Sequence, residues 1–184
     1  MTVVTATLKQ LPGLAKPRRK FVAALLATIL ALRGRVNYRN LARYGAYCEQ
    51  SYARQFAQPF PWLAYHAQML QNAVPATHEL IAAQDASFIP KSGQLTPGLG
   101  QFYNGCAGRA ERGLEISALG VVDLTQKGAY VVAVAQTQTP PPPLKKAQLE
   151  LTRLDQAITQ LQTARPHLPA SLRHLAADGW YAKQ

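Results

Sequence analysis

The sequence contains only two cysteines, Cys48 and Cys106. Two cysteines are too few for a disulfide framework or a four-cysteine zinc site, and such scarcity is typical of a protein from a reducing compartment. The four histidines show no close ligand spacing, so we interpret them as ordinary side chains. These absences exclude small proteins that are held together by disulfides and proteins that bind zinc through four cysteines.

A long apolar run is also missing. The run at residues 21–32 has twelve residues, whereas a membrane span needs about 20. Its basic-then-apolar order resembles that of a signal peptide, but no small-residue cleavage pattern comes after it. We therefore expect no membrane partner and interpret the run as a buried core helix.

Acidic residues are scarce, since nine Asp and Glu stand against 20 Lys and Arg, for a formal charge of +11. Residues 1–84 hold ten basic and two acidic side chains, or +8, and residues 85–184 hold ten and seven, or +3. We therefore expect the amino-terminal half to bind a polyanion. Basic ribosomal and membrane-surface proteins share such an excess, so charge alone does not choose among these classes.

The length of 184 residues suffices for one large or two small domains. We expect residues 1–75 to form a basic helical domain, because Pro75 comes after a predicted helix at residues 63–72. The first fifteen residues are polar to mildly apolar and are expected to fray. Residues 76–184 are then the second domain.

Two short helices in the first domain surround a glycine turn. Asn37 is a suitable N-cap for a helix over residues 38–44, Gly45 ends it, and a second helix is predicted over residues 49–58. This pair resembles a helix-turn-helix, although helical hairpins are also common structural units. The side chains expected to contact DNA phosphates are Arg39, Arg43 and Arg54.

The second domain begins with a short apolar run at residues 78–90, which is typical of a buried strand. It contains one carboxylate, Asp85, and an ionised group in a strand interior needs a partner or a metal ion. The alternative is an ordinary capping or turn aspartate. The order of the later elements along the chain favours the first interpretation.

A loop is expected over residues 91–112, with strands over residues 114–123 and 129–135 that pair as a hairpin. An amphipathic helix is predicted over residues 145–165, and a last short strand runs from residue 171 to Asp178. The helix should pack on the sheet, although its apolar face would also suit a coiled-coil seam. That face comprises Ala147, Leu151, Leu154, Ile158 and Leu161.

A helical crossover returns its strand parallel to the sheet that it left. If the last strand lies beside the first, Asp85 and Asp178 reach the same end of one mixed sheet. Two carboxylates about 4 Å apart repel by roughly 4 kcal/mol at a surface-like dielectric, so such a pair needs a cation. The predicted class is α+β or α/β.

The long loop carries basic and aromatic side chains in alternation. Long loops beside a catalytic acid are frequently functional, and the alternative is a solvated surface loop. Glu115, on the next strand, is interpreted as a paired surface acid. The residues expected to contact DNA here are Lys91, Arg109 and Arg112, interleaved with Phe102 and Tyr103.

Four segments resemble the DDE transposases of bacterial insertion sequences, which have a ribonuclease-H-like catalytic core. They are residues 85–93, 98–105, 109–117 and 177–181, and the resemblance extends from residue 23 to the carboxyl terminus. The resemblance implies an incomplete ribonuclease-H-like mixed sheet with three antiparallel strands, a helix and a fourth strand parallel to the first.

In that family three acids hold two divalent ions, usually Mg²⁺, with Mn²⁺ as a substitute. Asp85 resembles the first acid and Asp178 the second, so both are the implied catalytic and metal-binding residues. The third, a glutamate on a later helix, has no counterpart here, which implies an amino-terminal part that is inactive alone. The implied partner is double-stranded DNA at the element ends and target, in the bacterial cytoplasm at the nucleoid, and a homodimer is compatible with this.

The implied function is binding of element-end DNA, with metal-dependent cleavage and strand transfer. The first alternative is a non-catalytic DNA-binding module or repressor derived from a transposase. The second is a discarded gene product whose open sheet edge leads to aggregation.

Overall fold

The computed structural model of the chain describes residues 2–93, 95–138 and 152–182. The chain divides into two compact units, Met1–Ala73 and Val74–Gln184. The expected boundary, Pro75, lies at the start of the second unit. Each unit is described by itself.

The first unit is helical. Its first helix contradicts the expectation that residues 1–15 fray, because Thr7, Leu8 and Leu11 are buried. Asn72 donates a hydrogen bond to the Thr7 hydroxyl at 3.0 Å and so ties the first helix to the last. The helices are α1 (Thr2–Gln10), α2 (Lys16–Ala31), α3 (Tyr38–Tyr44), α4 (Glu49–Phe56) and α5 (Trp62–Ala73).

The predicted core helix is confirmed as α2, whose buried residues include Phe21, Val22 and Leu25. The Phe21 ring lies 5.2 Å from the ring of Tyr47 and 5.7 Å from that of Tyr52, between ring centroids. Tilted aromatic pairs at such distances stabilise beyond the area that they bury. This aromatic group fixes α2 against the chain that enters α4.

The two short helices around the glycine turn are also confirmed. The Asn37 side chain accepts a hydrogen bond from the Asn40 backbone N–H at 2.8 Å and caps α3. Gly45 ends that helix in an extended conformation. A side chain there would collide with the Tyr52 hydroxyl and the Leu41 carbonyl, so close packing of α3 on α4 requires glycine.

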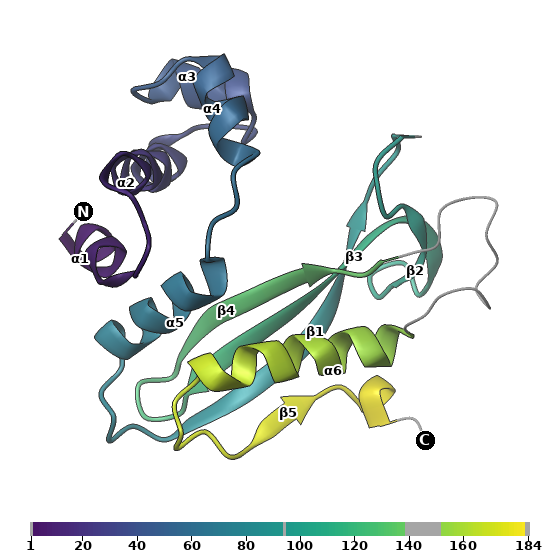
Figure 1. The fold of residues 1–184 in the computed structure, drawn as a ribbon. Helices are drawn as coiled ribbons and strands as arrows, with labels where there is room; N and C mark the ends of the chain where they lie inside the picture. The colour runs from purple at the N-terminus through teal and green to yellow at the C-terminus, as the bar shows by residue number, and fades with distance from the viewer. Residues whose placement is uncertain (1, 94, 139–151, 183–184) are drawn as a thin grey trace. The chain divides into compact units, whose positions relative to one another are not determined.

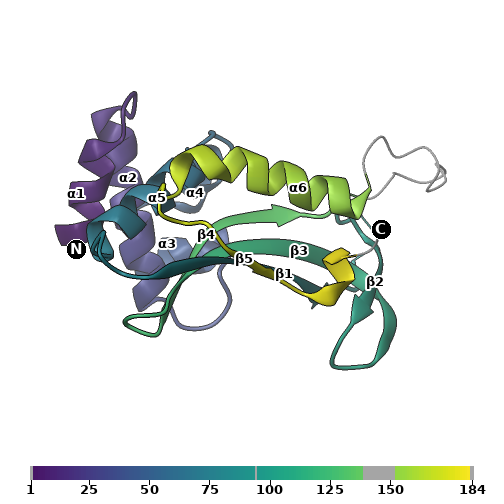
Figure 2. The same cartoon turned by 90° about the horizontal axis from the view of Figure 1, so that it is seen from below.

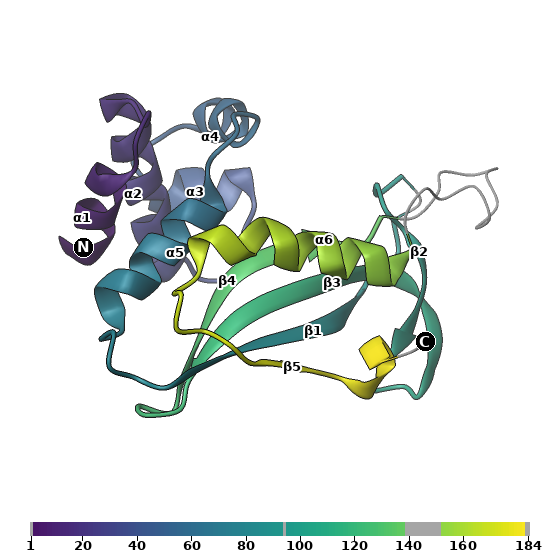
Figure 3. The same ribbon diagram turned by 60° about the horizontal axis from the view of Figure 1, so that its bottom comes forward.

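The second unit is a mixed sheet with one helix on a face (Figures 1 and 3). β1 pairs with β3 antiparallel and with β5 parallel, and β3 also pairs antiparallel with β2 and β4. The coarse prediction of an α+β domain with a last strand parallel to the first is therefore confirmed. The elements are β1 (Leu80–Pro90), β2 (Gly100–Asn104), β3 (Arg109–Asp123), β4 (Gly128–Gln136), α6 (Arg153–Ala164) and β5 (Leu175–Ala177), with 3₁₀ turns at Arg165–His167 and Gly179–Ala182.

The expected long loop over residues 91–112 is partly wrong. Residues 100–104 form β2, and β3 begins at Arg109, so a short hairpin replaces the second half of the loop. The reason is tertiary, because the Phe102 side chain is buried and needs the sheet to cover it. A run of only five residues, bounded by glycines, gave no strand periodicity to detect.

The predicted apolar face of the helix is partly wrong within the described residues. Leu154 and Leu161 are half-buried, but Ile158 is 42% exposed, and the fully buried residues of α6 are Ala157, Gln160 and Ala164. Small residues let the helix approach the sheet closely, and Figure 2 shows it running along the strands. Ala147 and Leu151, and the helix start expected near residue 145, lie outside the described residues.

A buried polar cluster joins this helix to the sheet. The Gln84 amide on β1 donates to the Gln160 side chain at 3.1 Å, to the Ala157 carbonyl at 3.2 Å and to the Ser117 hydroxyl at 3.2 Å. Gln160 in turn donates to the Ser117 carbonyl at 3.1 Å. Buried amides need such partners, and this requirement explains why a glutamine occupies the inner face of α6.

The opposite end of β1 is closed by a histidine–aspartate pair. His78 Nδ1 lies 2.7 Å from Asp123 Oδ2, and the Asp123 side chain is fully buried. Burial by itself raises the pKa of Asp123, but hydrogen bonds from His78 and from the backbone N–H groups of Gln126 and Thr125 outweigh it. The net pKa lies below its ordinary value, so the carboxylate is ionised and the His78 ring donates.

We expect Asp123→Asn to lower the thermal midpoint of the second unit by several degrees at neutral pH, because the amide presents a donor to His78. A group whose pKa is lower in the folded state stabilises above its unfolded pKa of about 4, and this stabilisation is lost as the pH falls through the lower folded value. Melting curves of both proteins at stepwise lower pH measure this. A midpoint difference that does not shrink on acidification would contradict the prediction.

Candidate functional site

The parallel pairing of β5 with β1 places the two predicted acids together. Ala177, the last residue of β5, is the register partner of Gln84 on β1. Asp85 follows Gln84 on β1, and Asp178 is the first residue after β5. Both side chains are exposed, and both line one cleft of about 440 Å³.

Asp85 lies inside a strand, as predicted, but its side chain is exposed instead of buried. Strand alternation turns Gln84 inward and Asp85 outward, so Asp85 is solvated. One of its oxygens, Oδ1, accepts a hydrogen bond from the Ala86 backbone N–H at 2.8 Å. Because the carboxylate is exposed to water, it does not require a buried partner.

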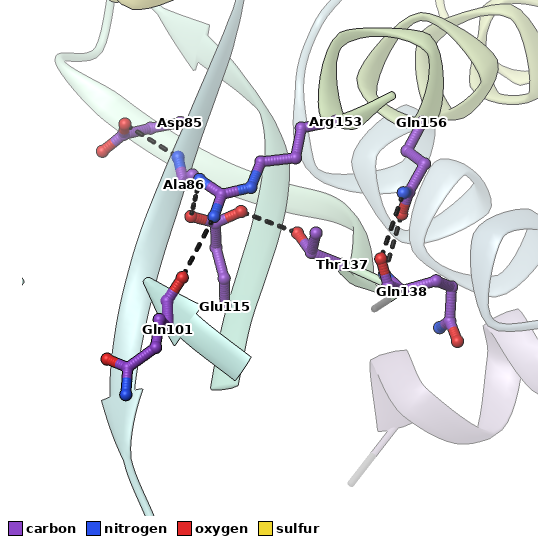
Figure 4. A network of polar contacts seen from close by, with 8 residues as sticks. All are labelled: Asp85, Ala86, Gln101, Glu115, Thr137, Gln138, Arg153 and Gln156. Atoms are coloured by element: carbon purple, nitrogen blue, oxygen red, sulfur yellow. Dashed lines mark hydrogen bonds and ion pairs between the residues drawn. The ribbon is translucent and has the colours of Figure 1, made fainter. Parts of the chain in front are cut away.

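The cleft forms where β1 loses its neighbour. β5 ends opposite Gln84, so beyond that point side chains from both faces of β1 reach the same opening. Asp85 lies on one side of β1 and Glu115 on the other, as their register and Figure 4 agree. We call this opening the acidic cleft; it is lined by Asp85, Ala86, Tyr103, Glu115, Arg153, Asp178 and Tyr181.

Glu115 is paired, as predicted, but it is not a surface acid, because its side chain is only 12% exposed. Its Oε1 accepts a hydrogen bond from the Thr137 hydroxyl at 2.9 Å, and its Oε2 lies 3.4 Å from an Arg153 nitrogen. Glu115 therefore links β3, the end of β4 and the first turn of α6 (Figure 4).

Arg153 is the basic residue of the acidic cleft. Beside its contact with Glu115, it donates to the Gln101 carbonyl at 3.4 Å, and its guanidinium carbon lies 4.8 Å from the centre of the Phe102 ring. The side chain stays 34% exposed. It is thus held in position on several sides while it reaches solvent.

Tyr181 reports on the electrostatics of the cleft. Burial raises the pKa of Tyr181, and the negative charges of Asp85, Glu115 and Asp178 raise it further, against a hydrogen bond with Ser117 that lowers it. The net pKa lies above its ordinary value, so the side chain is a neutral phenol. Three carboxylates therefore act on one hydroxyl at this edge of β1.

The donor set of the acidic cleft suits a hard divalent cation. Mg²⁺ is bound in many sites by one or two carboxylates together with substrate phosphates and water, rather than by a cage of protein ligands. Asp85 and Asp178 supply two carboxylates that face solvent. In the part of the chain that the structure describes, no group of three or more His, Cys, Asp or Glu side chains gathers as a metal site, which agrees with Glu115 lying on the other side of β1.

All six predicted DNA-contacting residues are exposed. In the second unit Arg109 pairs with Glu111 on the same strand, β3, at 2.8 Å, and neither Lys91 nor Arg112 lines the acidic cleft. In the first unit they are Arg39 and Arg43 on α3 and Arg54 on α4.

Sequence reasoning missed Arg153. A signal for it exists, because the Thr152 hydroxyl and the Asp155 carboxylate form a capping box that starts α6 at Arg153. The predicted start near residue 145 placed Arg153 inside the helix, where nothing distinguished it from an ordinary surface arginine.

Neither a model of a known protein family nor a curated protein sequence matches this chain significantly. The family resemblance of the motifs therefore stays a prediction. Among the described residues, no helix combines the length and apolar character needed to cross a membrane.

The geometry predicts coupled titration at the acidic cleft. In Asp85→Asn and in Asp178→Asn the pKa of Tyr181 should fall toward its ordinary value, because each change removes a charge that opposes tyrosinate formation. NMR of ¹³C-labelled tyrosine, with the Tyr181 signal assigned from Tyr181→Phe, measures this. Glu79→Gln, at the far end of β1, is the control and should leave the titration unchanged. An unchanged titration in both aspartate variants would contradict the cleft geometry.

Proposed function

We propose that the chain is part of a DDE-type transposase, whose second unit is a ribonuclease-H-like core for metal-dependent DNA cleavage and strand transfer. One observation carries the proposal. Asp85 and Asp178 lie 93 positions apart in the chain, yet the parallel β1–β5 pairing makes them line one cleft. The motifs around both residues support the same family.

The two aspartates would hold the divalent ions as ligands and would transfer no protons. When bound, the ions supply Lewis-acid activation of a water or 3′-hydroxyl and stabilise the leaving oxygen of an in-line displacement. Asp85 is oriented for this by its hydrogen bond from the Ala86 N–H. Tyr181, as a neutral phenol, keeps a hydrogen-bond donor among the carboxylates without adding negative charge.

In this proposal the first unit binds the DNA. Exposed arginines lie on the two short helices around Gly45, in a unit with few acids to neutralise them. Contacts of arginine with phosphates give affinity without sequence information. The partner is double-stranded DNA at element ends, and the corresponding location is the bacterial nucleoid.

A second candidate function is DNA binding without catalysis, as a module or repressor derived from a transposase. The charge of +8 in residues 1–84 favours it, because electrostatic attraction to phosphates requires no metal. The two candidates differ in their dependence on divalent ions, which titrations with metal and with DNA separate.

The transposase proposal predicts that Mg²⁺ and Mn²⁺ bind the wild-type chain and that Asp85→Asn or Asp178→Asn weakens binding by more than about tenfold. Calorimetric titration measures the affinity. Mn²⁺ should also broaden the NMR signals of residues around Asp85 first, because the ion is paramagnetic. Glu79→Gln serves as the charge-matched control, and metal affinity equal to that of the wild type in both aspartate variants would refute the proposed site.

For DNA binding we expect steep salt dependence and no effect of a chelator. Replacing Arg39, Arg43 and Arg54 together by Gln should reduce the slope of log affinity against log salt by about 0.9 for each phosphate that is no longer neutralised. The control replaces three exposed lysines of the same unit, Lys9, Lys16 and Lys20, by Gln. Equal reductions in affinity in the two triple variants would show general charge attraction and contradict a specific role of the short helices.

A further inference from the structure

We infer that Arg153 is a DNA-contacting residue of the acidic cleft, and that it binds a backbone phosphate of the strand that passes the two aspartates. The inference rests on the proposed function and deepens it. It assigns a role to a side chain that the sequence motifs did not single out.

The position of Arg153 is the first reason. Arg153 shares the acidic cleft with Asp85 and Asp178, but it approaches from α6, on the other side of β1 from Asp85 (Figure 4). A DNA strand that lies along the uncovered edge of β1 would meet both sides in succession. A phosphate next to the one at the aspartates would then lie within reach of the guanidinium.

The charge of the cleft is the second reason. The cleft holds three carboxylates and one guanidinium, so its lining opposes the approach of a polyanion when no cation is bound. A fixed arginine inside the cleft offsets part of this repulsion before any metal binds.

Preorganisation of the side chain is the third reason. The Phe102 ring faces the guanidinium at 4.8 Å, and the Gln101 carbonyl and Glu115 orient two of its nitrogens at 3.4 Å each. These contacts limit the rotamers of a side chain that otherwise loses much entropy on binding. At 34% exposure, the planar group retains donors toward solvent, and its fork geometry suits phosphate oxygens.

The test measures binding of a short duplex to the full chain by fluorescence anisotropy, in chelator and over a salt series. Arg153→Gln should weaken binding roughly tenfold and reduce the log–log salt slope by about 0.9. Arg153→Lys should keep the slope and lose part of the affinity. Arg165→Gln, at the other end of α6, is the control and should match the wild type.

Glu115→Gln separates a DNA contact from a structural role. If Arg153 binds phosphate, removal of its carboxylate partner frees it, and binding should be equal to or tighter than in the wild type. If the pair serves only to hold α6 on the sheet, both Glu115→Gln and Arg153→Gln should weaken DNA binding alike through loss of fold. Equal weakening, or an Arg153→Gln affinity within about twofold of the wild type, would overturn the inference.

A measurement on the wild-type chain tests the contact even if the variants fail to fold. The ¹⁵Nε resonance of Arg153, assigned from Arg153→Lys, should shift as duplex DNA is added, and an unshifted signal at saturation would refute the contact. If inorganic phosphate at equal ionic strength shifts the signal and DNA does not, the site binds free anions instead, which also overturns the inference. Since these titrations are done in chelator, a failure of metal binding would refute the cleavage proposal and leave the Arg153 result to stand alone.

Discussion

The short parallel pairing of β5 with β1 is the constraint on which the candidate site depends. It involves only three residue pairs, Ala82 with Leu175, Ala83 with Ala176 and Gln84 with Ala177, and it is joined by a hydrogen bond from the Ala82 N–H to the His174 carbonyl at 2.9 Å. Because β5 stops there, the edge of β1 beyond Gln84 is open. The same three pairs thus align two aspartates and create the cleft that they line.

So short a strand cannot hold its register by backbone hydrogen bonds alone, and the polar cluster under α6 contributes to its support. Gln84 is the last β1 residue paired with β5, and its side chain is held by hydrogen bonds to Ser117 and Gln160 beneath α6. Tyr181, just after β5, hydrogen-bonds to the same Ser117. The helix, the central strands and the chain after β5 are therefore coupled through one serine.

The two parts of the chain differ in charge, since residues 1–84 carry +8 and residues 85–184 carry +3. A chain of net charge +11 places three carboxylates, Asp85, Glu115 and Asp178, along one cleft of the second unit. Arg153 is the one basic residue among those that line the cleft in the described part of the chain.

The sequence by itself determined the features that act over a few residues. The caps of α3, the turn between Asp123 and Gly128, the α2 core helix and the strand that contains Asp85 all come from local propensity, periodicity and turn chemistry. Tertiary structure decided the rest: which face of α6 is buried, that residues 100–104 form β2, and that Arg153 enters the cleft. These depend on contacts between residues far apart in the chain, such as Phe102 with Arg153 and Gln84 with Gln160, and a local pattern carries no information about which distant partner will cover it.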